Sequence, residues 1–294
     1  MMHRVSSGKT REIVVAVAPV AHVGTFLPTE CRNPGSPQEI AAETQRCVAA
    51  GAAVVHLHVR NERGEIVSEL SWFRETLDRI FDRCDVIVNA STGGKSELSR
   101  EERCVALEDP RVELASLNMG STNFGDGVYI NTLEDIRYWA GRMQEARVVP
   151  ELEVFSSAMI WSAAALAEEG ILKNPLHYNI CLGFPGSTPA LATELVHLAA
   201  LIPADASWGF LHEGMTDLSL VAAALGLGAA TLRVCYEDGG YLAPGKPARS
   251  NADLVEQLVR LIRAAGCEPA AVEQTRANLN TKRNRGDQKE DNSG

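Results

Sequence analysis

The 294-residue sequence lacks paired cysteines, an excess of positive charge and any long apolar run. Its seven cysteines are scattered, odd in number and without a Cys-x-x-Cys pair, which argues against a disulfide framework and against a thiolate zinc site. The net charge of −10 argues against nucleic acid or an anionic membrane surface as the main partner. Scattered, unpaired cysteines of this kind are typical of reduced thiols, so we expect a cytoplasmic protein. No stretch is long enough to span a membrane.

A secretory signal peptide is also disfavoured. Residues 13–27 are fairly apolar and follow a basic start, but Pro19 and His22 interrupt the run. We interpret this segment as the first strand of the fold and the loop that follows it. The composition, 45% hydrophobic and 22% charged, is that of an ordinary globular protein with a large core.

Apolar runs rich in β-branched residues alternate with amphipathic segments along the chain. Eight such pairs in about 250 residues predict an α/β fold, a (β/α)8 TIM barrel. An open doubly wound sheet is the alternative, but residues 20–24 are not the glycine-rich turn that usually follows its first strand. We predict one catalytic domain over 1–279 and a disordered tail over 280–294, which has no large apolar residue. The expected strands are 13–18, 53–59, 86–90, 112–117, 148–155, 176–182, 206–211 and 230–235, and the expected helices are 37–50, 71–81, 99–107, 132–144, 156–168, 189–200, 216–225 and 251–265.

The second expected strand carries two histidines, His56 and His58. Side chains alternate along a strand, so both point to the same face, about 6.6 Å apart, and can bind one metal ion. Two histidines with a purely structural role, in the core or on the surface, would show the same pattern. Other residues of the chain are therefore needed to distinguish a metal site from such a pair.

Polar residues also follow the other expected strands, where the active site of such a barrel lies. Arg233 and Glu237 are four residues apart, so Glu237 faces the barrel interior if Arg233 does. A carboxylate there is costly unless it is paired or binds a metal. Because one strand separates the last strand from the second, Glu237 can join His56 and His58 as a catalytic zinc set. A salt bridge from Glu237 to Arg233 is the alternative.

Six motifs occur in order: His-Leu-His-Val-Arg (56–60), Ser-Thr-Gly-Gly (91–94), Ala-Ser-Leu-Asn-Met-Gly-Ser-Thr-Asn-Phe (115–124), Pro-Glu-Leu-Glu-Val-Phe (150–155), Leu-Gly-Phe-Pro-Gly (182–186) and Arg-Val-Cys-Tyr-Glu-Asp (233–238). Over about 13–278 they resemble the β-keto acid cleavage enzyme family, whose founding activity is 3-keto-5-aminohexanoate cleavage. The resemblance implies a zinc-dependent barrel that condenses a β-keto acid with acetyl-CoA, giving acetoacetate and a new acyl-CoA. It also implies a homo-oligomer, with a tetramer as the expected size.

By the same resemblance, Zn²⁺ is bound by His56, His58 and Glu237. Arg233 and Asp238 form a catalytic pair in which Arg233 anchors the substrate carboxylate and Asp238 takes a proton. A glutamate of the 150–155 strand supports this pair; Glu151 and Glu153 share a face, and we place Glu153 in the catalytic set. The expected substrate-binding residues are His22, Ser91, Thr92, Gly93, Ser116 and Asn118.

Two segments depart from the family pattern. His22 occupies the place of a glutamate that recognises the substrate amine in the aminohexanoate enzyme, so a neutral or anionic substrate tail is favoured over a cationic one. His22 is also compatible with a loop residue that points to water. Residues 209–217 lack the arginine of a family segment that follows the seventh strand, which leaves open whether the acyl acceptor is acetyl-CoA or another acyl-CoA.

Two other functions remain compatible with the residues. One is a zinc-dependent TIM-barrel hydrolase or CoA-independent lyase. Amidohydrolases also use His-x-His, but there the pair lies on the first strand and further metal-binding histidines follow on later strands. In this chain the pair lies on the second expected strand, and the later histidines do not stand in similar sequence motifs. The other is a barrel without catalytic activity, which would hold no stoichiometric zinc.

Overall fold

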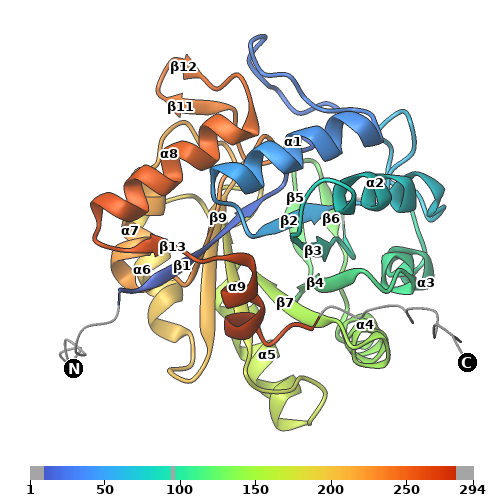
Figure 1. Cartoon of the computed structure of the whole chain (residues 1–294). Helices are drawn as coiled ribbons and strands as arrows, with labels where there is room; N and C mark the ends of the chain where they lie inside the picture. The colour runs from blue at the N-terminus through green and yellow to red at the C-terminus, as the bar shows by residue number, and fades with distance from the viewer. Residues whose placement is uncertain (1–9, 94–96, 283–294) are drawn as a thin grey trace, which may run out of the picture.

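In the computed structural model, which describes residues 10–93 and 97–282, eight parallel strands close into a ring (Figure 1). The first and last strands pair in register, with Val15 opposite Leu232, so the ring has no open edge. This confirms the predicted (β/α)8 TIM barrel. The ring consists of β1 (Glu12–Val17), β2 (Val54–Leu57), β3 (Ile87–Ala90), β4 (Val112–Asn118), β7 (Val149–Val154), β8 (His177–Leu182), β9 (Ser207–His212) and β10 (Thr231–Arg233).

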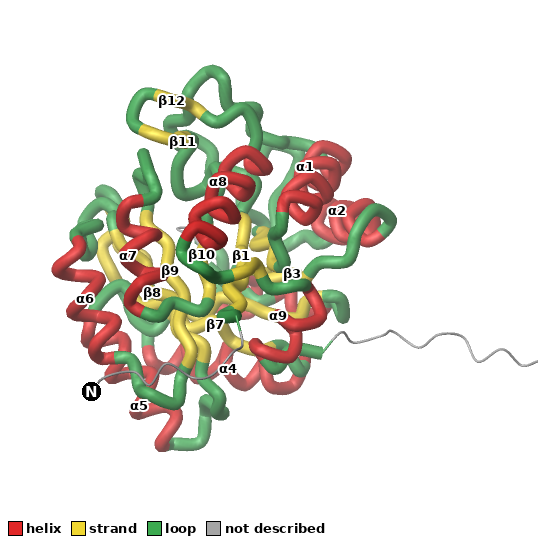
Figure 2. Tube along the Cα trace, turned by 60° about the vertical axis from the view of Figure 1, so that its left-hand side comes forward, coloured by secondary structure: helices red, strands yellow, loops and turns green. Residues whose placement is uncertain are grey.

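Helices cover the outside of the ring, as Figure 2 shows for α6, α7 and α8 beside the strands. The buried apolar residues of the long helices belong to the same core cluster as the outward-facing side chains of the strands. The bounds of α1 and α2 agree with the predicted ranges. The helices between the ring strands and after the last of them are α1 (Pro37–Ala50), α2 (Ser71–Phe81), α3 (Arg100–Arg103), η1 (Val105–Glu108), α4 (Leu133–Ala146), α5 (Ser157–Glu168), α6 (Ala192–Leu201), α7 (Ser219–Leu227) and α8 (Asn251–Ala264).

Several short elements were not predicted. The loop after β4 forms a hairpin of β5 (Thr122–Phe124) and β6 (Gly127–Tyr129), and the loop after β10 contains β11 (Tyr241–Ala243) and β12 (Lys246–Pro247). After α8, β13 (Glu268–Pro269) pairs with β1, and α9 (Val272–Leu279) follows it. These elements are too short, or bury too few apolar positions, to give a periodic signal.

The barrel interior changes from apolar to polar along the strands. Its lower part is an apolar cluster that includes Val54, Ile87 and Leu114, and Leu279 of α9 closes it. Two residues further along, the inward positions are polar: His56 follows Val54, Asn89 follows Ile87, and Ser116 follows Leu114. The strand pleat therefore places the polar side chains at the carboxyl ends of the strands.

Within the described residues, the structure contains no helix long and apolar enough to cross a membrane. The predicted tail can be compared only over its first three residues, since 283–294 lie outside the described part. Asn280 ends α9 in the left-handed conformation, and Thr281 donates a hydrogen bond to Glu113, so the chain is held against the barrel up to this point.

Candidate active site

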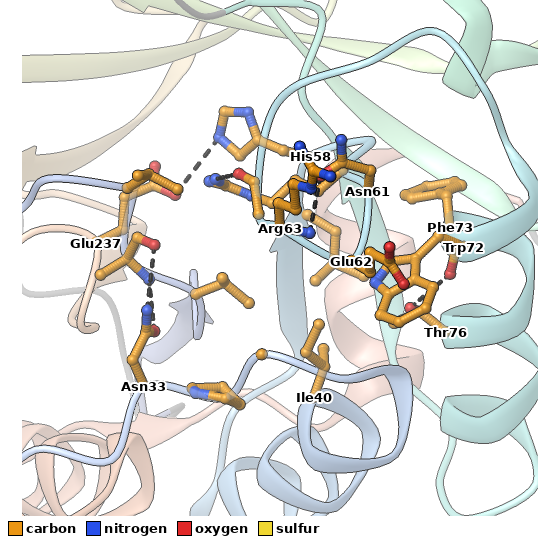
Figure 3. A pocket seen from close by; sticks show the side chains of 18 of the residues that line it. Asn33, Ile40, His58, Asn61, Glu62, Arg63, Trp72, Phe73, Thr76 and Glu237 are labelled. Atoms are coloured by element: carbon orange, nitrogen blue, oxygen red, sulfur yellow. Dashed lines mark hydrogen bonds and ion pairs between the residues drawn. The ribbon is translucent and has the colours of Figure 1, made fainter.

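Three cavities meet at the carboxyl ends of the strands. A small one of about 60 Å³ lies at the mouth of the barrel and is lined by His56, His58, Arg233 and Glu237. A wide one of about 1030 Å³ lies above it. A side pocket of about 180 Å³ lies beside β2, where Figure 3 shows His58 and Glu237 facing each other across from side chains of α2.

His22, His58 and Glu237 form the tightest cluster of metal-binding side chains among the described residues. Each offers a ligand atom within 4.8 Å of the other two. His58 Nε2 lies 3.4 Å from Glu237 Oε2, and His22 Nε2 lies 3.8 Å from the same oxygen. The carboxylate follows β10, one histidine follows β2, and the other comes from the β1–α1 loop.

His56 lies beside this cluster. Its ring centroid is 5.2 Å from that of His58, with the two rings nearly perpendicular, and it lines the small cavity. The structure thus brings the predicted ligands His58 and Glu237 together, with His56 adjacent. It also turns His22, one of the expected substrate-binding residues, into the site and not toward water.

The protonation states of this group suit a divalent metal. Burial lowers the pKa of His56 to about 4 and that of His58 well below its usual range, so both imidazoles are neutral. Burial disfavours the charged form of Glu237, but its contact with His58 and the positive charge of Arg233 outweigh burial and hold its pKa well below the usual range. Nδ1 of His56 and Nδ1 of His58 are buried without a hydrogen-bond partner. Neutral imidazoles and an ionised carboxylate are the ligands that Zn²⁺ requires.

Arg233 and Asp238 form a buried ion pair next to the cluster. Arg233 donates through Nε to Oδ2 of Asp238 at 2.8 Å and through Nη2 to Oδ1 at 2.5 Å, a bidentate geometry. Nη2 also reaches Glu237 Oε1 at 3.3 Å. The Cys235 thiol donates to the same carboxylate of Asp238 at 2.9 Å. The two residues predicted to form a catalytic pair therefore lie in contact, and the salt bridge from Arg233 to Glu237 exists as well.

The structure separates the two glutamates of β7. Glu153 lines the small cavity and accepts a hydrogen bond from Asn118 Nδ2 at 2.8 Å. Glu151 lies one layer deeper and accepts from Asn89 Nδ2 at 2.7 Å. Burial, reinforced by the charge of Glu151, raises the pKa of Glu153 to about 8. At neutral pH Glu153 therefore carries a proton that it can donate toward the cavity.

The predicted substrate residues fall into two groups. Ser91, Gly93 and Asn118 line the small cavity together with His22. Thr92 and Ser116 are buried against each other, because the Thr92 hydroxyl donates to the Ser116 carbonyl and the Thr92 amide donates to the Ser116 hydroxyl at 3.4 Å. In this conformation they support the loop after β3 and do not line the cavity.

Two residues at the site were missed by sequence reasoning. Tyr129 of β6 lines the small cavity, and its hydroxyl oxygen accepts from Asn118 at 3.1 Å and from Arg103 at 3.2 Å. Arg103 also donates to the Thr92 carbonyl at 3.1 Å, with its guanidinium carbon 4.0 Å from the Trp139 ring centroid. The only signal for Tyr129 was its position in a long loop after a strand, which does not specify a hairpin.

Comparison with known proteins places this geometry in a family. The family model described as beta-keto acid cleavage enzyme matches residues 17–280. The 3-keto-5-aminohexanoate cleavage enzyme of Fusobacterium nucleatum is 35% identical over 260 residues, covering 87% of this chain and 94% of the relative. The 3-oxoadipate:acetyl-CoA acetyltransferase of Cupriavidus necator is 33% identical over 277 residues, covering 92% and 95% of the two chains.

Solved structures agree on the fold. A structure described as a ternary complex of ObcA with a C4-CoA adduct and oxalate superposes with a TM-score of 0.69 at 22% identity, covering 84% of this chain and 67% of that one. At this identity the likeness concerns the fold alone. The family match over nearly the whole barrel, together with the two relatives, shows that this chain belongs to the beta-keto acid cleavage enzyme family.

Proposed function

We propose that this protein is a zinc-dependent acyltransferase that condenses a β-keto acid with acetyl-CoA or another acyl-CoA, giving acetoacetate, when acetyl-CoA is used, and a new acyl-CoA. The observation that carries the proposal is the juxtaposition of two neutral, buried imidazoles and an ionised carboxylate with the buried Arg233–Asp238 pair. Family membership supports the reaction class, because relatives carry the names of β-keto acid cleavage and acetyl-CoA transferase enzymes.

The proposed metal ligands are His56, His58 and Glu237. A zinc ion held by them would act as a Lewis acid on the keto group of the substrate. The side chains that remain around the cavity would then bind and orient the substrate, since all of them point into the same space at the mouth of the barrel.

Arg233 is the proposed anchor of the substrate carboxylate, and Asp238 the proposed proton acceptor. The bidentate contact with Asp238 fixes the plane of the guanidinium, which leaves Nη2 directed at the cluster. Ser91, Gly93 and Asn118 would position the substrate on the opposite side, with Glu153 as a protonated donor beneath it. Thr92 and Ser116 are proposed to hold the Ser91–Gly93 loop in position.

The wide cavity is proposed as the place of the acyl-CoA. It opens directly onto Glu237 and Asp238, and residues 213–216 form part of its wall. These residues belong to the segment that lacks the family arginine, and the wall is instead built from Glu213, Gly214, Met215 and Thr216. Its volume of about 1030 Å³ is at the upper end of ordinary ligand cavities, as a second substrate as large as a thioester of CoA requires.

We also propose that the protein is a homo-oligomer. Neighbouring helices α5 and α6 expose Trp161 and Val196, which are 66% and 51% exposed, and Leu191 just before α6 is 52% exposed. A contact surface between copies of the chain would bury this apolar face. Light scattering of the purified protein is expected to give a multiple of the chain mass, and Trp161→Glu is expected to lower it.

The metal assignment is tested by the zinc content of purified variants. Glu237→Gln is expected to bind zinc far more weakly, since a neutral amide is a poorer ligand than a carboxylate. Glu62→Gln, an exposed neighbour on the wall of the side pocket, serves as the matched control and is expected to keep its zinc. Full zinc occupancy in Glu237→Gln would exclude Glu237 as a ligand.

A further inference from the structure

Within the described part of the chain, one buried arginine lacks a carboxylate partner. Arg60, Arg233 and Arg276 are all buried, with 6%, 5% and 7% exposure. Arg233 and Arg276 each lie within 4 Å of two or more carboxylates. Among the described residues, Arg60 has none at that distance; it donates instead to the Gly64 carbonyl at 3.0 Å and contacts His22 Nδ1 at 3.1 Å.

Burying a guanidinium without a counter-ion costs free energy. A buried arginine without such a partner at the entrance of a site therefore indicates that an anion from outside the chain binds there. Glu237 acts on Arg60 electrostatically but is already in contact with His58 and Arg233. Two hydrogen bonds also use only part of the five N–H donors of the guanidinium.

The contact with Arg60 fixes the hydrogen position on His22. A guanidinium only donates, so Nδ1 of His22 must accept, and the neutral ring then carries its hydrogen on Nε2. Nε2 lies 3.8 Å from Glu237 Oε2 and faces the site. His22 therefore presents a hydrogen-bond donor to the site, and its Nε2 lacks the lone pair that a metal ligand needs.

Arg60 lines both the side pocket and the wide cavity, whereas His22 lines the wide and small cavities. The pocket begins at His58 and Glu237, and its far wall is formed by Trp72 and Phe73 of α2 with Ile40 of α1 (Figure 3). Its volume of about 180 Å³ suits a short chain rather than a bulky group. A substrate whose keto group lies at the histidine cluster can therefore extend its other end past the guanidinium of Arg60.

We propose that Arg60 recognises a carboxylate at the far end of the substrate, with His22 as a second donor, so that the preferred β-keto acid is a dicarboxylate. This inference rests on the proposed function, because the far end is defined relative to the keto group. It narrows the expectation of a neutral or anionic tail to the anionic one. It also assigns His22 to the substrate and not to the metal.

The test compares 3-oxo acids of matched chain length that end in a carboxylate, a methyl group or an ammonium group. With the purified protein and acetyl-CoA, the carboxylate-ended acid is expected to have a kcat/KM about tenfold or more above the others, the effect of one hydrogen bond to a charged group. Arg60→Gln is expected to lower kcat/KM for this acid about tenfold more than for the methyl-ended acid. The control Arg79→Gln, at a partly exposed arginine of α2 that lines none of the three cavities, is expected to leave the ratio unchanged.

A binding measurement separates this inference from the proposed reaction. Calorimetry with a saturated dicarboxylate, which has no keto group to react, is expected to show tighter binding to the wild type than the matching monocarboxylate, and a loss of that difference in Arg60→Gln. If acyl exchange occurs but the methyl- or ammonium-ended acid is preferred, the inference is overturned and the proposed function stands. If none of the acids reacts, the proposed function fails and calorimetry alone decides on Arg60. Should Arg60→Gln not fold, the wild-type comparisons and Arg60→Lys, which keeps the charge, still decide.

Discussion

Replacing Glu153 by glutamine is expected to remove a defined pH dependence of stability. Burial and the charge of Glu151 raise the pKa of Glu153 to about 8, whereas a glutamate in the unfolded chain titrates near 4.5. Between these values the folded protein holds a proton that the unfolded chain has lost, so the wild-type free energy of unfolding falls as pH rises. The slope is at most about 1.4 kcal/mol per pH unit, or about 2–3 kcal/mol between about pH 5.5 and about pH 7.5.

The assay is urea unfolding of chelator-treated protein at a series of pH values, so that no metal contributes to the titration. Glu153→Gln keeps an acceptor for the Asn118 amide, which donates to Glu153 at 2.8 Å, and should gain stability over the wild type as pH rises. Glu108→Gln, an exposed glutamate outside the site, should follow the wild type. A difference between Glu153→Gln and wild type that stays constant across this range would mean that Glu153 is ionised in the barrel, and its role as a proton donor would be lost.

Three further substitutions test other parts of the account. Arg276→Met should lower the free energy of unfolding by about 3–5 kcal/mol, because it leaves the buried Glu113 without its arginine. Arg260→Met, which breaks an exposed ion pair, should lower it by about 0–1 kcal/mol, and equal losses in urea unfolding would contradict this reasoning. Arg103→Met should lower kcat/KM about 10- to 100-fold while zinc stays bound, since the loop around the cavity loses the hydrogen bonds of Arg103. The partly exposed Arg100→Met should be neutral in the same steady-state assay, and an unaffected Arg103→Met would show that these hydrogen bonds are dispensable. Asp238→Asn should lower kcat about 100-fold or more through loss of the proton acceptor, and single-turnover rates equal to wild type would remove Asp238 from that role.

The ring of the barrel was predictable because segments rich in β-branched apolar residues alternate with helical segments eight times along the chain. The predicted segments 37–50 and 71–81 agree with α1 and α2 because apolar residues recur at helical spacing within these bounds. α9 escaped prediction because its buried face includes Arg276, whose burial depends on Glu113 of a strand far away in sequence. No local pattern contains that pairing.

The site was predictable where the strand pleat determines it. Alternation placed His56 and His58 on one face, and the motif after β10 supplied Glu237. The position of His22 was not predictable, because it follows from tertiary contacts of a loop: Asn33 holds the backbone of Ala21 through two hydrogen bonds, at 2.9 and 3.3 Å, and Arg60 holds the ring itself. Loop conformations of this kind depend on partners that are distant in the chain.

The central claim is tested most directly by acyl-CoA formation from acetyl-CoA and a panel of β-keto acids, measured with the protein before and after removal of its metal. We expect acetoacetate and a new acyl-CoA from at least one panel member, loss of both products on chelation, and their return when Zn²⁺ is added. Failure of every β-keto acid to form a new acyl-CoA with the metal site full, or turnover that persists undiminished without metal or without CoA, would contradict the account.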